Sequence, residues 1–377
     1  MANDNFFSSP MTRRRMLSRA AMLAAGAAGG GTLLAACGSG GGPTNSPASS
    51  SFTAAPAPES VKGSAVYLNY PGWIGSNNVA DFQKQYPGAE IKQSASGFET
   101  SIGVTQTIAQ NPKAYDLVLC TADIAQQLQA NNLILPIDEK NVPSLSLVED
   151  RFREIMPGVL PTDTDTFVIG YRKDIVKNPP RSWAELWKMA PQYHQKIVFT
   201  GWDRPALGIA LIHKGFKADS TDANELTQAK DSLLEIKPDV LAFKVSDLAQ
   251  PLADGSAVLS VGLSYEFVSL MAENPNIGII FPEEGTVFDV EAIAAVATTD
   301  TPEVALTFLD FMMRPPNYAN FVNTTRAARV STAADAMIDK VLLSPLMDVP
   351  KNATMQHFPG AEGAKAITLA WQQFQSG

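Results

Sequence analysis

Cysteine and histidine are scarce in this chain of 377 residues, which has two cysteines and three histidines. Two cysteines cannot build a disulfide framework, and His194, His213 and His357 do not match the Cys/His spacing of a zinc site. We therefore predict neither a metal centre nor a disulfide-stapled fold. Cys120 ends the apolar run YDLVLC and is predicted to be a buried small hydrophobic residue.

Motifs for nucleotide binding and acyl chemistry are also missing. No strand is followed by G-x-G-x-x-G, and neither a Walker A sequence nor a G-x-S-x-G elbow occurs. We predict no cofactor and no catalytic residues, so the chain is not expected to be an enzyme. Basic residues are in the minority: 25 Lys and Arg stand against 37 Asp and Glu after residue 37, a formal charge of −12. An acidic body argues against nucleic acid as a partner.

The N-terminus has the order of an export signal. TRRRMLS (12–18) supplies paired arginines, a small apolar run follows, and LAAC (34–37) resembles the lipobox of bacterial lipoproteins. We predict a twin-arginine-type signal peptide over 1–36 and a lipid on Cys37. An ordinary secretory signal with an incidental cysteine is the alternative. The Gly-, Ser- and Pro-rich segment 37–63 is predicted to be a flexible tether. The body would then be held at the outer face of the cytoplasmic membrane, as a cell-surface or periplasmic lipoprotein.

After the tether the hydrophobic pattern alternates between strands and helices. Apolar strands such as DLVLC (116–120) and TVFDVEAIAAVA (286–297) are separated by amphipathic helices such as PEVALTFLDFMM (302–313). This order is typical of an α/β fold, and two such units on an exported chain predict two lobes with a ligand between them. Ligands of such sheets bind beyond the carboxyl ends of the strands.

Some local predictions are specific enough to be checked. TFVIGYRKDIV (166–176) predicts a strand, and Ser182 with Glu185 forms the pattern of a capping box. Gly255 is predicted to end a short helix. The segment 99–115 is predicted to be a helix that presents one face made of Ile102, Thr105, Ile108 and Ala109.

Aromatic rings and carboxylates recur where the predicted strands end. Carboxylates accept the charge and N–H donors of an amine, and rings bind the cation over their faces. The predicted ligand-binding residues are Tyr70, Trp73, Asp123, Asp203, Asp247, Tyr265, Asp289 and Glu291. Glu291 is the strongest candidate, because a carboxylate inside an apolar strand is costly to bury without a partner. Asp203 and Asp247 have an alternative role as helix N-caps.

Several stretches of the body carry a family resemblance: YLNYPGW, YDLVLCTADIAQQLQANNLILPID, SWAELW, PLADGSAVLSVG and FPEEGTVFDVEAIAAVATT. In this order they resemble the bacterial spermidine/putrescine-binding proteins of ABC importers. The resemblance implies capture of a polyamine or related cationic solute, delivery to a membrane permease, and a monomer. It also implies a two-lobed periplasmic-binding-protein fold of type II, with crossing strands near 167–171, 287–291 and 326–331. Lobe 1 would comprise 64–168 and 289–328, and lobe 2 would comprise 169–288 and 329–377.

The resemblance also assigns roles to residues. Tyr70 and Trp73 fall where a Trp and a Tyr of the family sandwich the polyamine, and Glu291 falls at a family carboxylate that is usually Asp. Several positions depart from the family pattern. Asp289 replaces a Trp, and Asp123 replaces a Tyr. The family run Asp-Asp-Ala-Arg-Glu is WDRP (202–205) here, without its final acid, and a family Trp aligns near Gly262, with Tyr265 as the nearest ring.

Other functions stay open at this stage. The same fold could bind an amino acid, a quaternary amine or ferric ion. An exported hydrolase could pair Asp289 with Glu291, because residues two apart on a strand share a face. A structural surface lipoprotein is the remaining alternative.

Overall fold

The computed structural model describes residue 57 and residues 59–70, 72–95 and 101–377. The predicted signal peptide and Cys37 lie outside these residues. Ordered structure reaches into the end of the predicted tether 37–63, because Val61 is completely buried and β1 (Gly63–Leu68) begins two residues later. Among the described residues, no helix combines the length and the apolar character needed to cross a membrane.

A mixed sheet runs through the molecule in the order β2-β1-β3-β10-β5-β8-β6-β7. Its strands are β1, β2 (Ala89–Ser94), β3 (Leu117–Thr121), β10 (Thr286–Val296), β5 (Leu160–Arg172), β8 (Leu259–Leu263), β6 (Ile197–Thr200) and β7 (Val240–Lys244). Four short strands lie beside this path: β4 (Ile134–Leu135) and β12 (Ala353–Met355) pair with β10, and β9 (Ile277–Ile280) and β11 (Ala328–Arg329) pair with β5.

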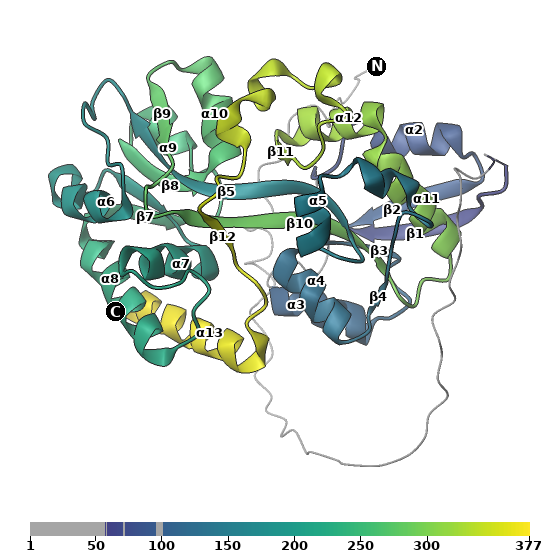
Figure 1. The fold of residues 1–377 in the computed structure, drawn as a ribbon, viewed down its shortest axis with the longest axis horizontal. Helices are drawn as coiled ribbons and strands as arrows, with labels where there is room; N and C mark the ends of the chain where they lie inside the picture. Colours follow the sequence, from purple (N-terminus) through teal and green to yellow (C-terminus); the bar gives the residue numbers. More distant parts are fainter. Residues whose placement is uncertain (1–56, 58, 71, 96–100) are drawn as a thin grey trace, which may run out of the picture.

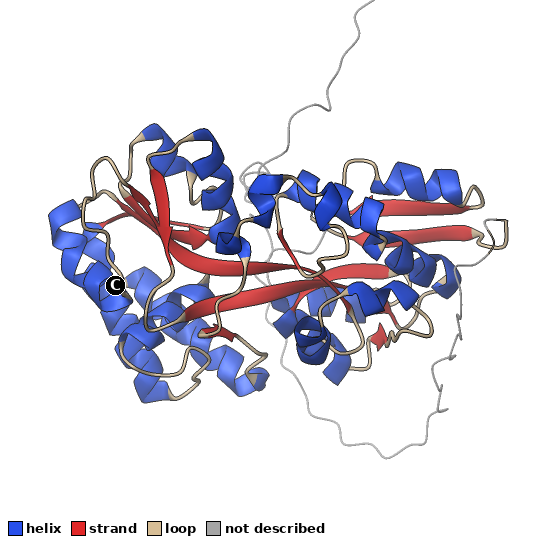
Figure 2. Cartoon of the chain, turned by 45° about the horizontal axis from the view of Figure 1, so that its top comes forward, coloured by secondary structure: helices blue, strands red, loops and turns tan. Residues whose placement is uncertain are grey.

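The two long strands β5 and β10 connect two bodies, which are visible on either side of them in Figures 1 and 2. They pair antiparallel with each other in the middle of the sheet. Toward one body β10 pairs with β3, and toward the other β5 pairs with β8. The two-lobed α/β fold is therefore confirmed. The parallel pairing expected of α/β units joins β2-β1-β3 in one lobe and β8-β6-β7 in the other, and the short β12 also pairs parallel with β10. The lobe boundaries given above stay a prediction.

Helices cover the sheet in both lobes. In the first lobe these are α2 (Asn78–Gln85), α3 (Ser101–Gln110), α4 (Ala122–Ala130), α5 (Asp150–Ile155), α11 (Pro302–Met313) and α12 (Pro315–Thr325). In the second they are α6 (Trp183–Met189), α7 (Asp203–His213), α8 (Ala223–Ile236), α9 (Gln250–Asp254), α10 (Ser264–Glu273) and the terminal α13 (Gly360–Ser376), which packs on α7 and α8. Between α12 and α13 the chain forms short 3-10 turns (335–337, 340–343 and 345–347) before β12.

Most of the local sequence predictions hold. The Ser182 side chain accepts the Glu185 N–H and begins α6, although the Glu185 carboxylate accepts the N–H of Arg181 instead of closing the box on Ser182. Gly255 ends α9 in the left-handed conformation at φ 78°. Cys120 is buried, and burial raises the pKa of its thiol.

Two predictions need correction. The strand predicted from residue 166 begins six residues earlier, because β10 and β11 pair with its polar first half. Among the α3 side chains that the structure describes (104–110), Val104 and Ile108 are buried, Thr105 is half-buried and Ala109 is exposed. The side chain of Ile102 lies outside the described residues.

Candidate functional site

Four carboxylates lie together on one face of the crossing strands. On neighbouring antiparallel strands Asp289 is the register partner of Asp165, and Glu291 is the partner of Asp163. Directly opposite residues on antiparallel strands have Cβ atoms about 5 Å apart on the same face, and residues two apart on one strand also share a face. We call these four residues the acid cluster.

The acid cluster is largely withdrawn from water. Asp163 is completely buried, and Glu291 exposes 4% of its surface. Ionised carboxylates at this spacing repel one another and lose hydration, so the fold tolerates them best when positive charge lies close by. Arg329 of β11 is the register partner of Asp163, so the chain itself brings one positive charge to this face. Four carboxylates outnumber that charge, so the arrangement is suited to a further cation.

Two of the four residues in the acid cluster, Asp163 and Asp165, were not predicted from the sequence. Asp163 and Asp165 belong to PTDTDT (161–166), which was outside the predicted strand because it contains no apolar residue. The signal that could have found them is the strict alternation of Thr and Asp, which gives a strand one acidic face.

Arg204 brings positive charge to one end of the cluster. It lies in the first turn of α7, and its Nη1 is 3.3 Å from Oδ2 of Asp123, at the start of α4 in the other lobe. Its Nη2 donates to the carbonyl of His357 over 2.5 Å. Asp289 is anchored beside this pair, because its Oδ1 accepts the N–H of Ala122 (3.2 Å) and of Val290 (2.8 Å).

Burial changes the acidity of this group. Desolvation raises the pKa of Asp289 to about 7, and the nearby charge of Asp123 acts in the same direction, while Arg204 and the two N–H donors oppose the shift. The pKa of Asp203 is also raised, first by desolvation, with a further contribution from Asp123. Both pKa shifts arise first from the loss of hydration in this part of the site.

Aromatic rings line the same region from both lobes. Trp73, from the loop after β1, and Tyr265, in the first turn of α10, lie with ring centroids 6.0 Å apart. Phe167 shares a face of β5 with Asp163 and Asp165, and it meets Trp202 edge-on at 5.9 Å. Phe167 and Trp202 were not among the predicted site residues. Tyr70 packs against the core at the end of the β1 segment.

Asp247 stands apart from the other predicted residues. It has a left-handed backbone (φ 52°), and among the described residues its side chain bonds only to the Ser246 hydroxyl, at 3.4 Å. The alternative role as an N-cap is wrong for both Asp203 and Asp247, because Trp202 occupies that position in α7 and Ala249 occupies it in α9.

The lobes touch each other around the site. Besides Asp123–Arg204 and Trp73–Tyr265, the Gln126 side chain of α4 meets the C-terminal segment, with Nε2 at 2.9 Å from Nδ1 of His357 and Oε1 accepting the Phe358 N–H at 2.7 Å. Because these contacts join the two lobes, the lobes are in a closed arrangement around the site.

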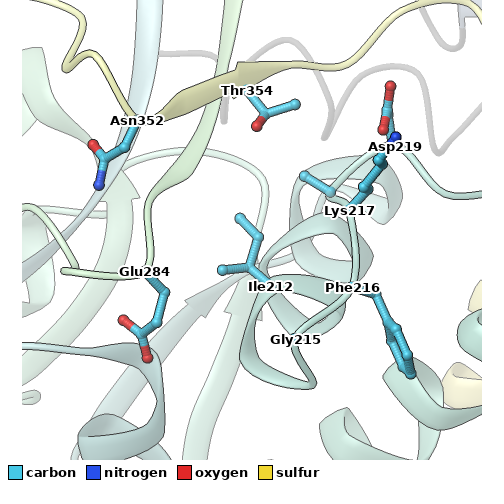
Figure 3. A pocket seen from close by; sticks show the side chains of 9 residues that line it. Ile212, Gly215, Phe216, Lys217, Asp219, Glu284, Asn352 and Thr354 are labelled. Atoms are coloured by element: carbon cyan, nitrogen blue, oxygen red, sulfur yellow. The ribbon is translucent and has the colours of Figure 1, made fainter.

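Two surface cavities lie outside this region. One, of about 560 Å³, is lined by the end of α7 and by Glu284 and Asn352 (Figure 3). The other, of about 340 Å³, lies between α4 and α5 beside His357. Neither is lined by a predicted site residue, so we place the candidate site at the lobe interface.

Comparison with known proteins identifies the family of the chain. The family model "Bacterial extracellular solute-binding protein" matches residues 77–344. This chain belongs to that family. The solute-binding protein is 25% identical over 310 residues to the "Spermidine/putrescine-binding periplasmic protein" of Escherichia coli, which covers 78% of this chain and 87% of that protein.

Solved structures share the fold of the solute-binding protein. The spermidine/putrescine ABC transporter substrate-binding protein PotD of Streptococcus pneumoniae has a TM-score of 0.72 at 18% identity, covering 84% of this chain and 99% of that one. The Tp0655 (TpPotD) lipoprotein of Treponema pallidum has a TM-score of 0.68 at 18% identity, covering 82% and 98%.

Proposed function

We propose that this solute-binding protein captures a polyamine such as putrescine or spermidine, or a related cationic solute, between its lobes and delivers it to the membrane permease of an ABC importer. The observation that carries the proposal is the acid cluster on the strands that connect the lobes. The relatives named for spermidine and putrescine support the same class of solute.

The chemistry of the site supports a primary amine at the Glu291 end. An ammonium group has three N–H donors and a full charge, which two facing carboxylates can satisfy. The rings of Trp73 and Tyr265 offer surfaces for a cation or for the methylenes between amines.

The proposed cycle follows from the topology. The lobes are joined by β5 and β10, so a hinge motion about these strands would open the site to solute. A cation bound at the acid cluster would favour the closed state, because closure adds the rings carried by the two lobes, Trp73 and Tyr265, to the carboxylates that the crossing strands already hold together. The closed protein would then dock on the permease, and a lipid on Cys37 would hold it at the membrane.

A thermal-shift screen tests the proposal. The protein without its signal peptide and Cys37 (residues 38–377) is mixed with putrescine, spermidine, amino acids, choline and ferric ion. A solute at 100 times its dissociation constant raises the free energy of unfolding by about 2.7 kcal/mol. We expect this stabilisation with a polyamine and expect Glu291→Gln to abolish it.

Glu90→Gln is the matched control, because Glu90 lies on β2 and pairs with Lys92 at the surface. Stabilisation by an amino acid, choline or ferric ion, with none by a polyamine, would keep the binding role and overturn the polyamine assignment.

A further inference from the structure

Asp289 lies among more carboxylates than the chain balances with cations. Asp165 is its register partner across the crossing strands. Asp289 also accepts the N–H of Ala122, the residue before Asp123, so the Asp123 carboxylate of α4 lies close to it. Arg204 of α7 brings a guanidinium to this group, 3.3 Å from Asp123. Three carboxylates therefore share one positive charge at this end of the site.

The other elements packed against Asp289 bring no second cation to it from the described residues. Asp203, in the first turn of α7, adds a further carboxylate. Glu291 lies two residues along β10 on the same face. On β3 the Cys120 thiol stays neutral, because burial raises its pKa. The residues of β12 beside β10 (353–355) are Ala, Thr and Met, which do not titrate. Negative charge is thus in excess around Asp289 when no solute is bound.

The second arginine near the acid cluster is engaged at its other end. Arg329 of β11 is the register partner of Asp163, and its guanidinium forms ion pairs with Asp335 at 2.8 Å and with Asp348 at 3.7 Å. Neighbouring carboxylates that share too little positive charge and have lost hydration keep a proton between them. The raised pKa of Asp289, about 7, agrees with this expectation.

We infer that solute capture is coupled to the release of a proton: the solute-free site holds one proton at Asp289, and an ammonium group of the solute replaces it. The inference rests on the proposed function and adds a regulation of the same site by pH. An ammonium group brings its own charge and N–H donors, so it satisfies the carboxylates that otherwise retain the proton. The proton leaves to solvent and Asp289 becomes a carboxylate. The affinity for a cationic solute therefore falls as the medium becomes acidic.

The carboxylates that crowd Asp289 do not come from the second lobe. Asp165 is on the neighbouring crossing strand, and Asp123 is on α4 of the first lobe. A hinge motion would carry Arg204 away with α7 and leave both carboxylates beside Asp289. The excess of negative charge therefore persists when the lobes are apart, and the exchange of proton for solute accompanies capture.

Calorimetric titration in two buffers with different heats of ionisation counts the proton, because each proton released adds the heat of its uptake by the buffer. Residues 38–377 are titrated at pH 6, in phosphate and in MES, with whichever of putrescine and spermidine binds more tightly. The primary amines of the solute keep their protons at this pH, because their pKa lies near that of lysine, about 10.4. From the pKa of Asp289 we expect release of about 0.9 proton per solute at pH 6 and about 0.1 at pH 8, with about tenfold tighter binding at pH 8.

Two variants identify the group that releases the proton. Asp289→Asn can accept the same two hydrogen bonds and cannot ionise, so it should release no proton and bind with equal affinity at pH 6 and pH 8. His357→Gln is the control, because a histidine can exchange a proton in this pH range and His357 contacts Gln126 across the lobes. It should release as many protons as the wild type.

A heat of binding that is equal in both buffers would overturn the inference and leave the proposed function in place. That result needs only the wild type, so it does not depend on whether a variant binds solute. Proton release that persists in Asp289→Asn, or that disappears in His357→Gln, would also overturn the inference alone. Absence of binding of both amines to the wild type at pH 8 would overturn the proposed function itself.

Discussion

Replacing Asp289 by Asn should stabilise the protein in the absence of solute and flatten the dependence of its stability on pH. The carboxyl of Asp289 accepts the N–H groups of Ala122 and Val290 through one oxygen. An asparagine carbonyl oxygen can accept the same two hydrogen bonds, so the substitution removes the charge and keeps the acceptor.

The magnitude follows from the shift in acidity. Burial raises the pKa of Asp289 from its ordinary 3.8 to about 7. Between these values the unfolded state has lost its proton while the folded state keeps it, so folding becomes less favourable as the pH rises. Each pH unit costs about 1.4 kcal/mol, which gives a loss of up to about 4 kcal/mol between pH 4 and pH 7. Asp289→Asn removes this loss.

Urea unfolding of the solute-free protein at pH 5, 6, 7 and 8 measures the effect. We expect the variant to be about 2–4 kcal/mol more stable than wild type at pH 8, and the difference to shrink toward pH 4. Glu90→Gln is again the control and should follow the wild type. Parallel stability curves of wild type and Asp289→Asn over this range would mean that the Asp289 carboxyl is not desolvated in the folded state.

Three further predictions concern the core, the lobe contact and the anchor. Gly170→Ala should lower stability by about 1–3 kcal/mol, because the added Cβ would lie 2.5 Å from the ring of the fully buried Phe267; an unchanged urea midpoint would contradict this. Gln126→Ala removes the bonds to the C-terminal segment and should weaken solute affinity about tenfold, as titration would show, while an unchanged affinity would mean that this contact does not stabilise the closed state. Cys37→Ser should move the protein from the membrane fraction of cells to the soluble fraction, and equal fractionation would exclude a lipid on Cys37.

The site residues that could be predicted from the sequence are the carboxylates that interrupt an apolar strand. Asp289 and Glu291 are conspicuous because they lie inside a strand of Val, Ile and Ala, where burying a carboxylate without a partner costs free energy. Asp163 and Asp165 were not predicted to lie on a strand, because a run of Thr and Asp has no apolar periodicity that indicates one. Their burial comes from pairing with β10 and β11, which lie far away in the sequence.

The contact between Asp123 and Arg204 could not be read from local patterns. These residues are 81 positions apart and belong to different lobes, so their distance depends on how the lobes close. Each residue alone has ordinary roles at the start of a helix. The sequence identified Asp123 and Asp203 as strand-end acids, and the structure adds the cation that lies between them.

Direct calorimetric titration with spermidine and putrescine at pH 8, where Asp289 is ionised, tests the central claim most directly. The account predicts saturable binding of at least one of these amines with a stoichiometry of one, lost in Glu291→Gln and retained in Glu90→Gln. Saturable binding of a neutral or anionic solute, with no heat from either amine, would contradict it.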